Sequence, residues 1–320
     1  MNDSQLLEIL KNESCNPWLS IARRWLEILD KRPLSTKDIK IADTEKERIA
    51  KYMEHLKQYR LNLKKREPKL KSADYQIYED VLPCPCVGSP DAPIWLMLKN
   101  PGMCDWDWYD LVSIQMGRNK IKPEQLKDVQ IDGGCADEND ALRKRQQLLV
   151  RQLMFDFEQG SKFYVFEDVF KTFKGKSKYA CGSYDWYKKN LFPAGHFLGC
   201  EIWDAKSFAS SNLFVLDYHP YHSKSFFEQG MDEIRTPYWD KLVEYAFAKE
   251  KLMIFWGSKV LEKIRSKYKN EYFDAVEKRR IVILRGPSAS CSVKMADFPV
   301  GNSHFVKEYL KKERESERLF

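Results

Sequence analysis

The sequence predicts an α/β fold built on a central, mostly parallel sheet of four strands. Four short runs are continuously apolar, as strands covered on both faces must be: residues 94–98, 213–216, 252–256 and 281–284. Helical patterns lie between these runs, roughly over residues 142–158 and 259–268. Because buried strands that alternate with helices form parallel sheets with helices on both faces, we expect a three-layer α/β/α sandwich.

An N-terminal helical extension is expected to precede this sandwich. Over residues 1–75, apolar residues recur at helical spacing, and the stretch 57–71 is rich in Lys and Arg. Such a stretch is either a solvated basic face or a patch that follows DNA phosphates, and the extension can also be a module that binds a protein partner. We therefore divide the chain into a basic helical extension, residues 1–75, and a unit that carries the sheet, residues 76–320.

Polar residues stand at the carboxyl ends of three predicted strands, or soon after them. They are Lys99 and Asn100 after the first strand, Asp217, His219, His222 and Lys224 after the second, and Arg285, Ser288 and Ser290 after the fourth. Pro101 and Gly102 follow Asn100, so the first strand must stop there and the chain must turn. Ligands of open α/β sheets bind at the carboxyl ends of the strands. We therefore expect Asn100, Asp217 and Ser288 to line one cleft.

Composition and motifs argue against several classes of function. With 320 residues, 43% of them hydrophobic and 32% charged, the chain is globular, and its net charge of +7 permits a nucleic-acid partner. No apolar run has the length of a membrane span, and the N-terminus lacks a signal-peptide pattern, so we expect a soluble cytoplasmic protein without membrane contact. The eight Cys and five His show no metal-ligand spacing, and no phosphate-binding glycine-rich loop occurs, so neither a metal nor a cofactor is expected.

The order of the motifs at the strand ends resembles the uracil-DNA glycosylase superfamily. Residues 100–102 read Asn-Pro-Gly after the first strand, and Asp217 follows the second. Residues 256–257 read Trp-Gly at the end of the third strand, and residues 287–290 read Pro-Ser-Ala-Ser after the fourth. The resemblance covers about residues 80–309, and it identifies the unit that carries the sheet as a uracil-DNA-glycosylase-like catalytic domain.

The resemblance implies a DNA glycosylase, which flips a nucleotide out of double-stranded DNA and hydrolyses the bond between base and sugar. Asn100 would lie under the sugar and position the attacking water, since its amide can hydrogen-bond but cannot act as a base. In the superfamily an aromatic residue after the first motif stacks on the base, and the candidates here are Trp106, Trp108 and Tyr109. The candidates for phosphate contacts are Ser288 and Ser290, which match the serines of the last motif, together with Lys99, Lys224 and Arg285.

One residue of the family pattern is missing. Many members carry a His before Pro-Ser, where it stabilises charge on the leaving base, and Gly286 stands there in this chain. Arg285, His219 or His222 can take over that role. The missing His also favours an alternative function, a catalytically silent DNA-binding module with the same fold.

The residue at the end of the second strand predicts the substrate. Uracil enzymes usually place an Asn there, whereas this chain has Asp217. A carboxylate accepts a hydrogen bond from an exocyclic amine such as cytosine N4, and a protonated Asp can also donate to cytosine N3. Gly102 stands where uracil enzymes have a bulky Tyr, which leaves space for a substituent on C5 of the base. We therefore expect a 5-substituted cytosine of phage DNA, such as glucosylated 5-hydroxymethylcytosine, and a role in defence against phage.

Two alternatives remain open for these residues. Asn100 and Gly102 equally allow a repair glycosylase for uracil or other deaminated bases, although Asp217 argues against it. Asp217 can also have a purely structural role, capping the next turn or pairing with Lys224.

Overall fold

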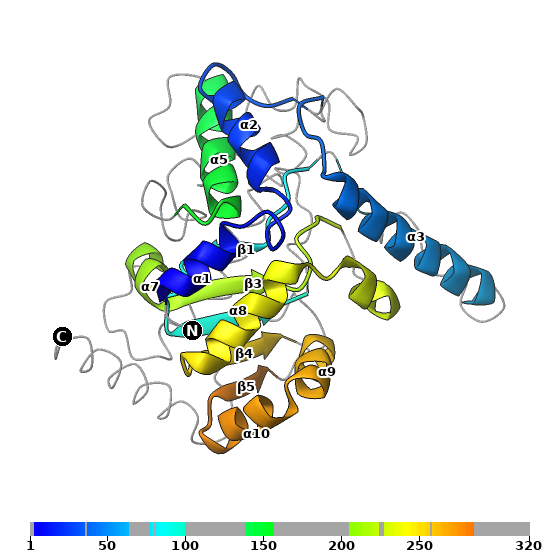
Figure 1. Cartoon of the computed structure of the whole chain (residues 1–320), viewed down its shortest axis with the longest axis vertical. Helices are drawn as coiled ribbons and strands as arrows, with labels where there is room; N and C mark the ends of the chain where they lie inside the picture. The colour runs from blue at the N-terminus through cyan, green and yellow to red at the C-terminus, as the bar shows by residue number, and fades with distance from the viewer. Residues whose placement is uncertain are drawn as a thin grey trace, which may run out of the picture.

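The computed structural model describes residues 3–35, 37–63, 77, 79, 81–99, 138–156, 205–223, 227–256 and 258–284. These residues form an α/β arrangement around one mixed five-stranded sheet with the strand order β1-β3-β2-β4-β5 (Figure 1). The strands are β1 (Cys86–Gly88), β2 (Ile94–Leu98), β3 (Leu213–Asp217), β4 (Leu252–Trp256) and β5 (Ile281–Leu284).

The four predicted apolar runs are all strands, but the sheet differs from the prediction in one respect. β1 is a fifth strand, and it pairs with β3 in the antiparallel direction. Its three residues, Cys-Val-Gly after a proline, are too few to show a strand pattern, so the predicted count of four was wrong. The pairs β2–β3, β2–β4 and β4–β5 are parallel. The carboxyl ends of β2 to β5 therefore lie at one edge of the sheet.

Helices precede, separate and flank these strands. They are α1 (Asp3–Leu10), α2 (Leu19–Leu29), α3 (Asp43–Leu63), α5 (Glu138–Leu153), α7 (Ala205–Asn212), α8 (Pro237–Ala248), α9 (Ser258–Lys267) and α10 (Lys269–Glu277), with a 3₁₀ helix η6 (Glu228–Ile234). The predicted helices at 142–158 and 259–268 correspond to α5 and α9. α8 begins at a proline, whose fixed φ and missing N–H suit the first helical position.

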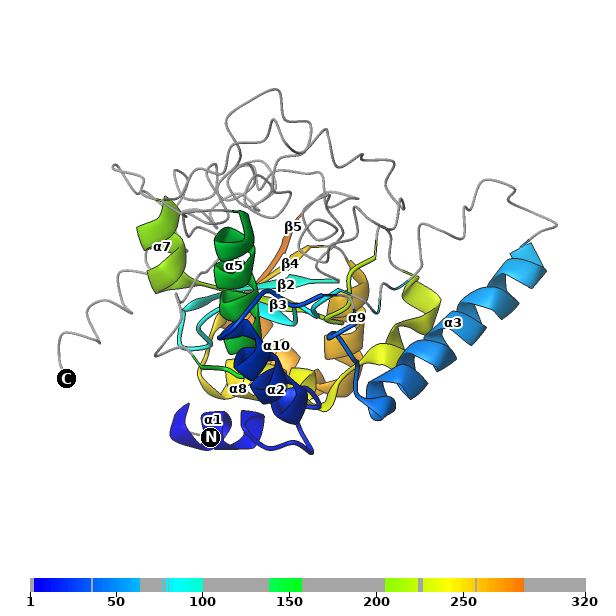
Figure 2. The ribbon, with the colours of Figure 1, turned by 90° about the horizontal axis from the view of Figure 1, so that it is seen from above.

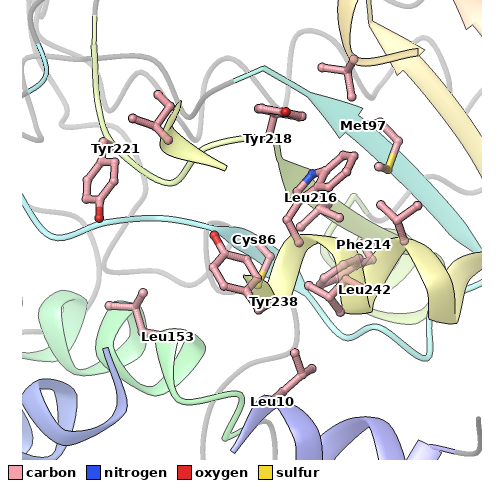
Figure 3. Packing of buried hydrophobic residues seen from close by; sticks show 14 of the residues in the cluster. Leu10, Cys86, Met97, Leu153, Phe214, Leu216, Tyr218, Tyr221, Tyr238 and Leu242 are labelled. Carbon is pink, nitrogen blue, oxygen red and sulfur yellow. The ribbon is translucent and has the colours of Figure 1, made fainter. Parts of the chain in front are cut away.

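Helix α8 covers one face of the sheet, which we call the α8 face. Ring contacts join the helix to β2 and to the residue after β3: Tyr245 lies 6.2 Å from Trp95, and Trp239 lies against Tyr218 with centroids 4.8 Å apart. Figure 3 shows Phe214 of β3 beside Leu242 of α8. Because side chains alternate along a strand, residues two apart in β3 share a face, and the α8 face takes every second side chain.

The opposite face of the sheet is buried as well. In β2 and β3 the residues on this face are Ile94, Leu96, Leu213 and Val215, and each is at most 5% exposed. This burial on both faces explains why the runs that form β2 and β3 are apolar throughout rather than alternating. Asp217 lies on this second face, because it follows Leu213 and Val215 at a spacing of two.

The N-terminal helices share one hydrophobic cluster with the α8 face. The cluster includes Leu10, Trp18 and Trp25 as well as Trp95 and Phe214. α1 packs against α8, and α2 packs against α5. In Figures 1 and 2, α3 extends outward with η6 beside it. The domain boundary at residue 75 stays a prediction, and within the described ranges the helices before it pack against α8, α5 and η6.

Buried polar contacts tie the N-terminal segment to α5. The side-chain amide of Gln146 accepts a hydrogen bond from the Leu34 N–H at 2.7 Å and donates one to the Leu34 carbonyl at 3.2 Å. Asn16 Nδ2 donates to the Leu153 carbonyl at 2.7 Å. These bonds satisfy backbone groups that burial would otherwise leave unpaired. Among the described helices, none is both long and apolar enough to cross a membrane.

Candidate functional site

The candidate site lies where β2 and β3 end side by side. Leu98 is in register with Asp217, so the two strands finish at the same level of the sheet. The pairing continues beyond the strands, because the Tyr218 N–H donates to the Leu98 carbonyl at 3.0 Å and the His219 N–H donates to the Lys99 carbonyl at 3.2 Å. The structure therefore brings Lys99, Asp217 and His219 together, as their positions after neighbouring strands predict.

Asp217 is a fully buried carboxyl group at this edge of the sheet. Its exposed fraction is 0%, and neither of its side-chain oxygens accepts a hydrogen bond from a described residue. Burial raises the pKa of Asp217 well above its usual range, since desolvation penalises the charged form. The neutral acid is thus favoured, and it presents one O–H donor and one carbonyl acceptor.

One alternative role for Asp217 is to cap the turn that follows it. The segment after it, residues 218–223, contains no group that donates a hydrogen bond to this carboxyl. Asp217 therefore does not cap the turn that these residues form. A pairing with Lys224 falls outside the described residues and stays a prediction.

His219 is neutral, and the proton of its ring lies on Nε2. The residue is fully buried, and its Nδ1 accepts a hydrogen bond from the Tyr221 N–H at 3.1 Å. Burial, with a smaller contribution from His222, lowers the pKa of His219 to about 3. A neutral imidazole that accepts at Nδ1 must carry its proton on Nε2, so that atom is a hydrogen-bond donor.

The segment of residues 218–223, which we call the 218–223 loop, is anchored on several sides. The Asp217 N–H donates to the Pro85 carbonyl at 3.0 Å, and the Cys84 N–H donates to the Pro220 carbonyl at 2.7 Å. The Tyr218 hydroxyl donates to Asp232 Oδ1 at 3.2 Å. The loop is therefore fixed to the segment before β1 and to η6, which holds His219 in a defined position. His222 is buried in the same loop, with an exposed fraction of 5%.

Glu45, a buried carboxyl group to which no sequence motif points, also contacts this loop. Its Oε2 accepts a hydrogen bond from the Tyr221 hydroxyl at 2.5 Å, and its Oε1 accepts one from Arg48 Nη1 at 2.6 Å. Burial raises the pKa of Glu45, while these two partners act in the opposite direction. The sequence does contain a signal for the burial of Glu45. Glu45 shares one helix face with the apolar residues Ile49 and Tyr52, which follow it at a spacing of four and seven residues.

A second buried group, the thiol of Cys86, lies within electrostatic range of Asp217. Burial is the main cause that raises the pKa of Cys86 to about 12. A hydrogen bond from Gln152 lowers this pKa, and Asp217 raises it further. The group is therefore a neutral thiol at physiological pH, and it is neither a nucleophile nor a thiolate ligand. This pair of residues adds no second reactive centre to the site.

Most of the predicted site residues lie outside the described residues. They are Asn100, Gly102, Trp106, Trp108, Tyr109, Lys224, Arg285, Ser288 and Ser290. Their roles in positioning water, stacking on the base and contacting phosphates stay predictions. The placed part of the site comprises Lys99, Asp217, His219 and His222.

The placed groups define what this edge of the sheet can do chemically. A neutral carboxylic acid offers a donor and an acceptor side by side, and the neutral His219 imidazole offers a second donor. Such a set matches the edge of a heterocycle that carries an adjacent acceptor and amine. Burial makes each of these hydrogen bonds selective, because a mismatched ligand leaves a buried polar group unpaired.

Comparisons with protein-family models, with curated proteins and with solved structures gave no match to this chain. The function therefore has to be inferred from the chemistry of the strand ends.

Proposed function

We propose that this protein is a DNA glycosylase that flips out a modified base and excises it, leaving an abasic site. The substrate we infer is a 5-substituted cytosine in double-stranded DNA, such as the glucosylated 5-hydroxymethylcytosine of phage DNA. The observation that carries the proposal is the buried carboxyl group of Asp217, which accepts no hydrogen bond from a described residue and lies at the end of β3. The three-layer arrangement, with helices on both faces of this sheet, belongs to the same proposal.

Asp217 would read the Watson–Crick edge of the flipped base. Its O–H donates to cytosine N3, and its carbonyl oxygen accepts from the N4 amine, which gives a bidentate pair. Uracil presents an N3–H donor and an O4 acceptor instead. To pair with uracil, the protonated acid would have to exchange the positions of its O–H and its carbonyl oxygen. In the orientation that reads cytosine, the neutral acid would place its O–H against uracil N3–H and its carbonyl oxygen against uracil O4, so both contacts would be mismatched.

The same proton would assist departure of the base. As the bond between base and sugar breaks, its electron pair stays with the base, and the Asp217 proton moves to N3, so cytosine leaves as a neutral molecule. Water adds to the anomeric carbon of the oxocarbenium-like sugar, and the proton it releases restores the acid. The His219 Nε2–H is a further donor near this edge, and Asn100 would position the water.

The requirement for a modified base follows from the same logic. An enzyme that excised ordinary cytosine would destroy the genome of its own cell, so the pocket must demand a further group on the base. Gly102 has no side chain at the position where the superfamily excludes 5-substituents, which leaves room for a hydroxymethyl or glucosyl group. Phage DNA that carries such groups is the natural target, so we propose a role in antiviral defence.

A panel of matched duplex oligonucleotides tests the proposal. Each duplex carries one cytosine, uracil, 5-hydroxymethylcytosine or glucosylated 5-hydroxymethylcytosine at the same position, and abasic sites are detected by alkaline strand cleavage. The proposal predicts cleavage of the modified cytosines and an intact cytosine strand. Release of uracil alone would favour the repair glycosylase, and tight binding of all duplexes without base release would favour the silent DNA-binding module.

A further inference from the structure

Helix α3 contacts the 218–223 loop from the other end of the sequence. Glu45, at the start of the helix, is fully buried and lies between the Tyr221 hydroxyl and the guanidinium of Arg48. Glu45 and Tyr221 are 176 residues apart in the chain. A buried carboxyl group is costly unless it is hydrogen-bonded on both oxygens, and this one is.

Tyr52 makes the second contact, two turns further along α3. Its ring lies 6.3 Å from the His219 ring and 5.8 Å from the Phe227 ring, and its hydroxyl accepts a hydrogen bond from the Phe227 N–H at 3.0 Å. Gly230 lets η6 approach this side chain, because a Cβ there would meet both Tyr52 Cδ2 and Phe227 Cδ1 at 2.9 Å. Tyr52 therefore borders His219 in a closely packed environment.

Tyr221 connects Glu45 with His219 through two different groups. Its hydroxyl is held by Glu45, and its backbone N–H is the donor to His219 Nδ1. The position of that N–H selects the tautomer, because the two neutral forms of imidazole differ only in which nitrogen keeps the proton. If Tyr221 were displaced, the His219 ring could carry its proton on Nδ1 instead of Nε2. Nδ1 would then be the donor, and Nε2 would no longer be one.

We propose that Glu45 and Tyr52 are positioning residues that hold His219 as the Nε2–H tautomer, and that α3 is consequently a structural part of the site. This inference rests on the proposed function for its catalytic meaning, but the tautomer itself is a property of the free protein. It gives the N-terminal helices a role different from that of a separate basic appendage. The helix completes the wall of the site next to the 218–223 loop.

The first test is nuclear magnetic resonance of the full chain without DNA, using ¹⁵N-labelled histidine. Long-range ¹H–¹⁵N correlations report the tautomer of each His, and a His219→Gln spectrum assigns the signal. We expect a single Nε2–H form in the wild type and in Glu45→Gln, whose side-chain oxygen still accepts from the Tyr221 hydroxyl. Glu45→Ala and Tyr221→Phe should show exchange between the two forms.

The matched control is Asp43→Asn, which removes an exposed carboxylate from the first turn of the same helix. It should leave the His219 signal unchanged. A single Nε2–H form in both Glu45→Ala and Tyr221→Phe would overturn the proposal, and so would an equal change in the control. If Glu45→Ala does not fold, Tyr221→Phe and Gly230→Ala decide, since the added Cβ displaces Tyr52 without touching a charged group.

The second test is single-turnover base release from the preferred duplex by the same variants. We expect Glu45→Ala and Tyr221→Phe to release the base at least tenfold more slowly, with less than twofold change in the dissociation constant for DNA, and Glu45→Gln to keep most of the rate. An unchanged rate in a variant whose tautomer has changed would contradict the positioning role. If the wild type releases no base at all, the proposed function fails, and the resonance experiment still decides the tautomer.

Discussion

Substitution of Asp217 by Asn should make the free energy of unfolding decrease less as the pH rises. The carboxamide has nearly the shape of the neutral acid and offers a donor and an acceptor as well, but it cannot ionise. In the wild type the buried carboxyl group holds its proton more tightly in the folded state than in the unfolded chain, because burial raises its pKa above 3.8. The folded state is therefore favoured most at low pH, and this advantage is lost as the pH rises through the folded pKa.

The size of the effect follows from proton linkage. One proton held by the folded state but not by the unfolded chain changes the free energy of unfolding by about 1.4 kcal/mol per pH unit. Between about pH 5 and about pH 6.5, the wild type should therefore lose up to about 2 kcal/mol relative to Asp217→Asn, for as long as the folded carboxyl keeps its proton. His219 has the opposite slope below its unfolded pKa, since burial lowers its pKa to about 3. That contribution is common to both proteins and cancels in the difference.

Urea denaturation of both proteins at several pH values measures this difference. A suitable control is Asp43→Asn, because the Lys46 ammonium lowers the pKa of Asp43, so its titration lies below the pH range used. The reasoning is refuted if the difference between wild type and Asp217→Asn does not change with pH. A difference of the opposite sign would show that Asp217 is charged in the folded state and stabilised by a cation.

Three further substitutions test other parts of the structure and the site. Asn100→Ala should abolish base release while DNA binding stays nearly intact, because its proposed partner is the attacking water; unchanged single-turnover release would remove Asn100 from the mechanism. Gly230→Ala should destabilise the fold by about 1–3 kcal/mol in urea denaturation, since its Cβ would lie 2.9 Å from ring carbons of Tyr52 and Phe227. Gln146→Ala should cost a similar ~1–3 kcal/mol because the buried N–H and carbonyl of Leu34 lose their partner; an unchanged denaturation midpoint would mean that water replaces the amide.

The strands of the sheet could be predicted because their signal is local. The runs that form β2 and β3 are buried on both faces, so their residues have to be apolar, and the pattern is visible in five residues or fewer. β1 gave no such signal, since only three residues pair with β3. The strand ends could be predicted for the same reason, and they place Asp217 and His219 beside Lys99.

The protonation and hydrogen bonding of the site could not be predicted, because they depend on segments that are far apart in the chain. Glu45 meets Tyr221 only when α3 packs beside η6, and neither residue carries a motif. The tautomer of His219 depends on a backbone N–H two residues later, which points to Nδ1 only in this loop conformation. The raised pKa of Asp217 likewise follows from full burial, and a sequence shows only that a carboxyl group ends a strand.

The most direct test of the central claim is single-turnover base release by wild type and Asp217→Asn from two duplexes, one with glucosylated 5-hydroxymethylcytosine and one with uracil. The wild type should release the modified cytosine and leave uracil in place. Asp217→Asn should lose activity on the modified cytosine, because it has no proton to transfer to the leaving base, and should gain activity on uracil, whose edge a carboxamide can read. Equal rates of wild type and variant on both duplexes would contradict base recognition by Asp217, and with it the case for a modified-cytosine substrate.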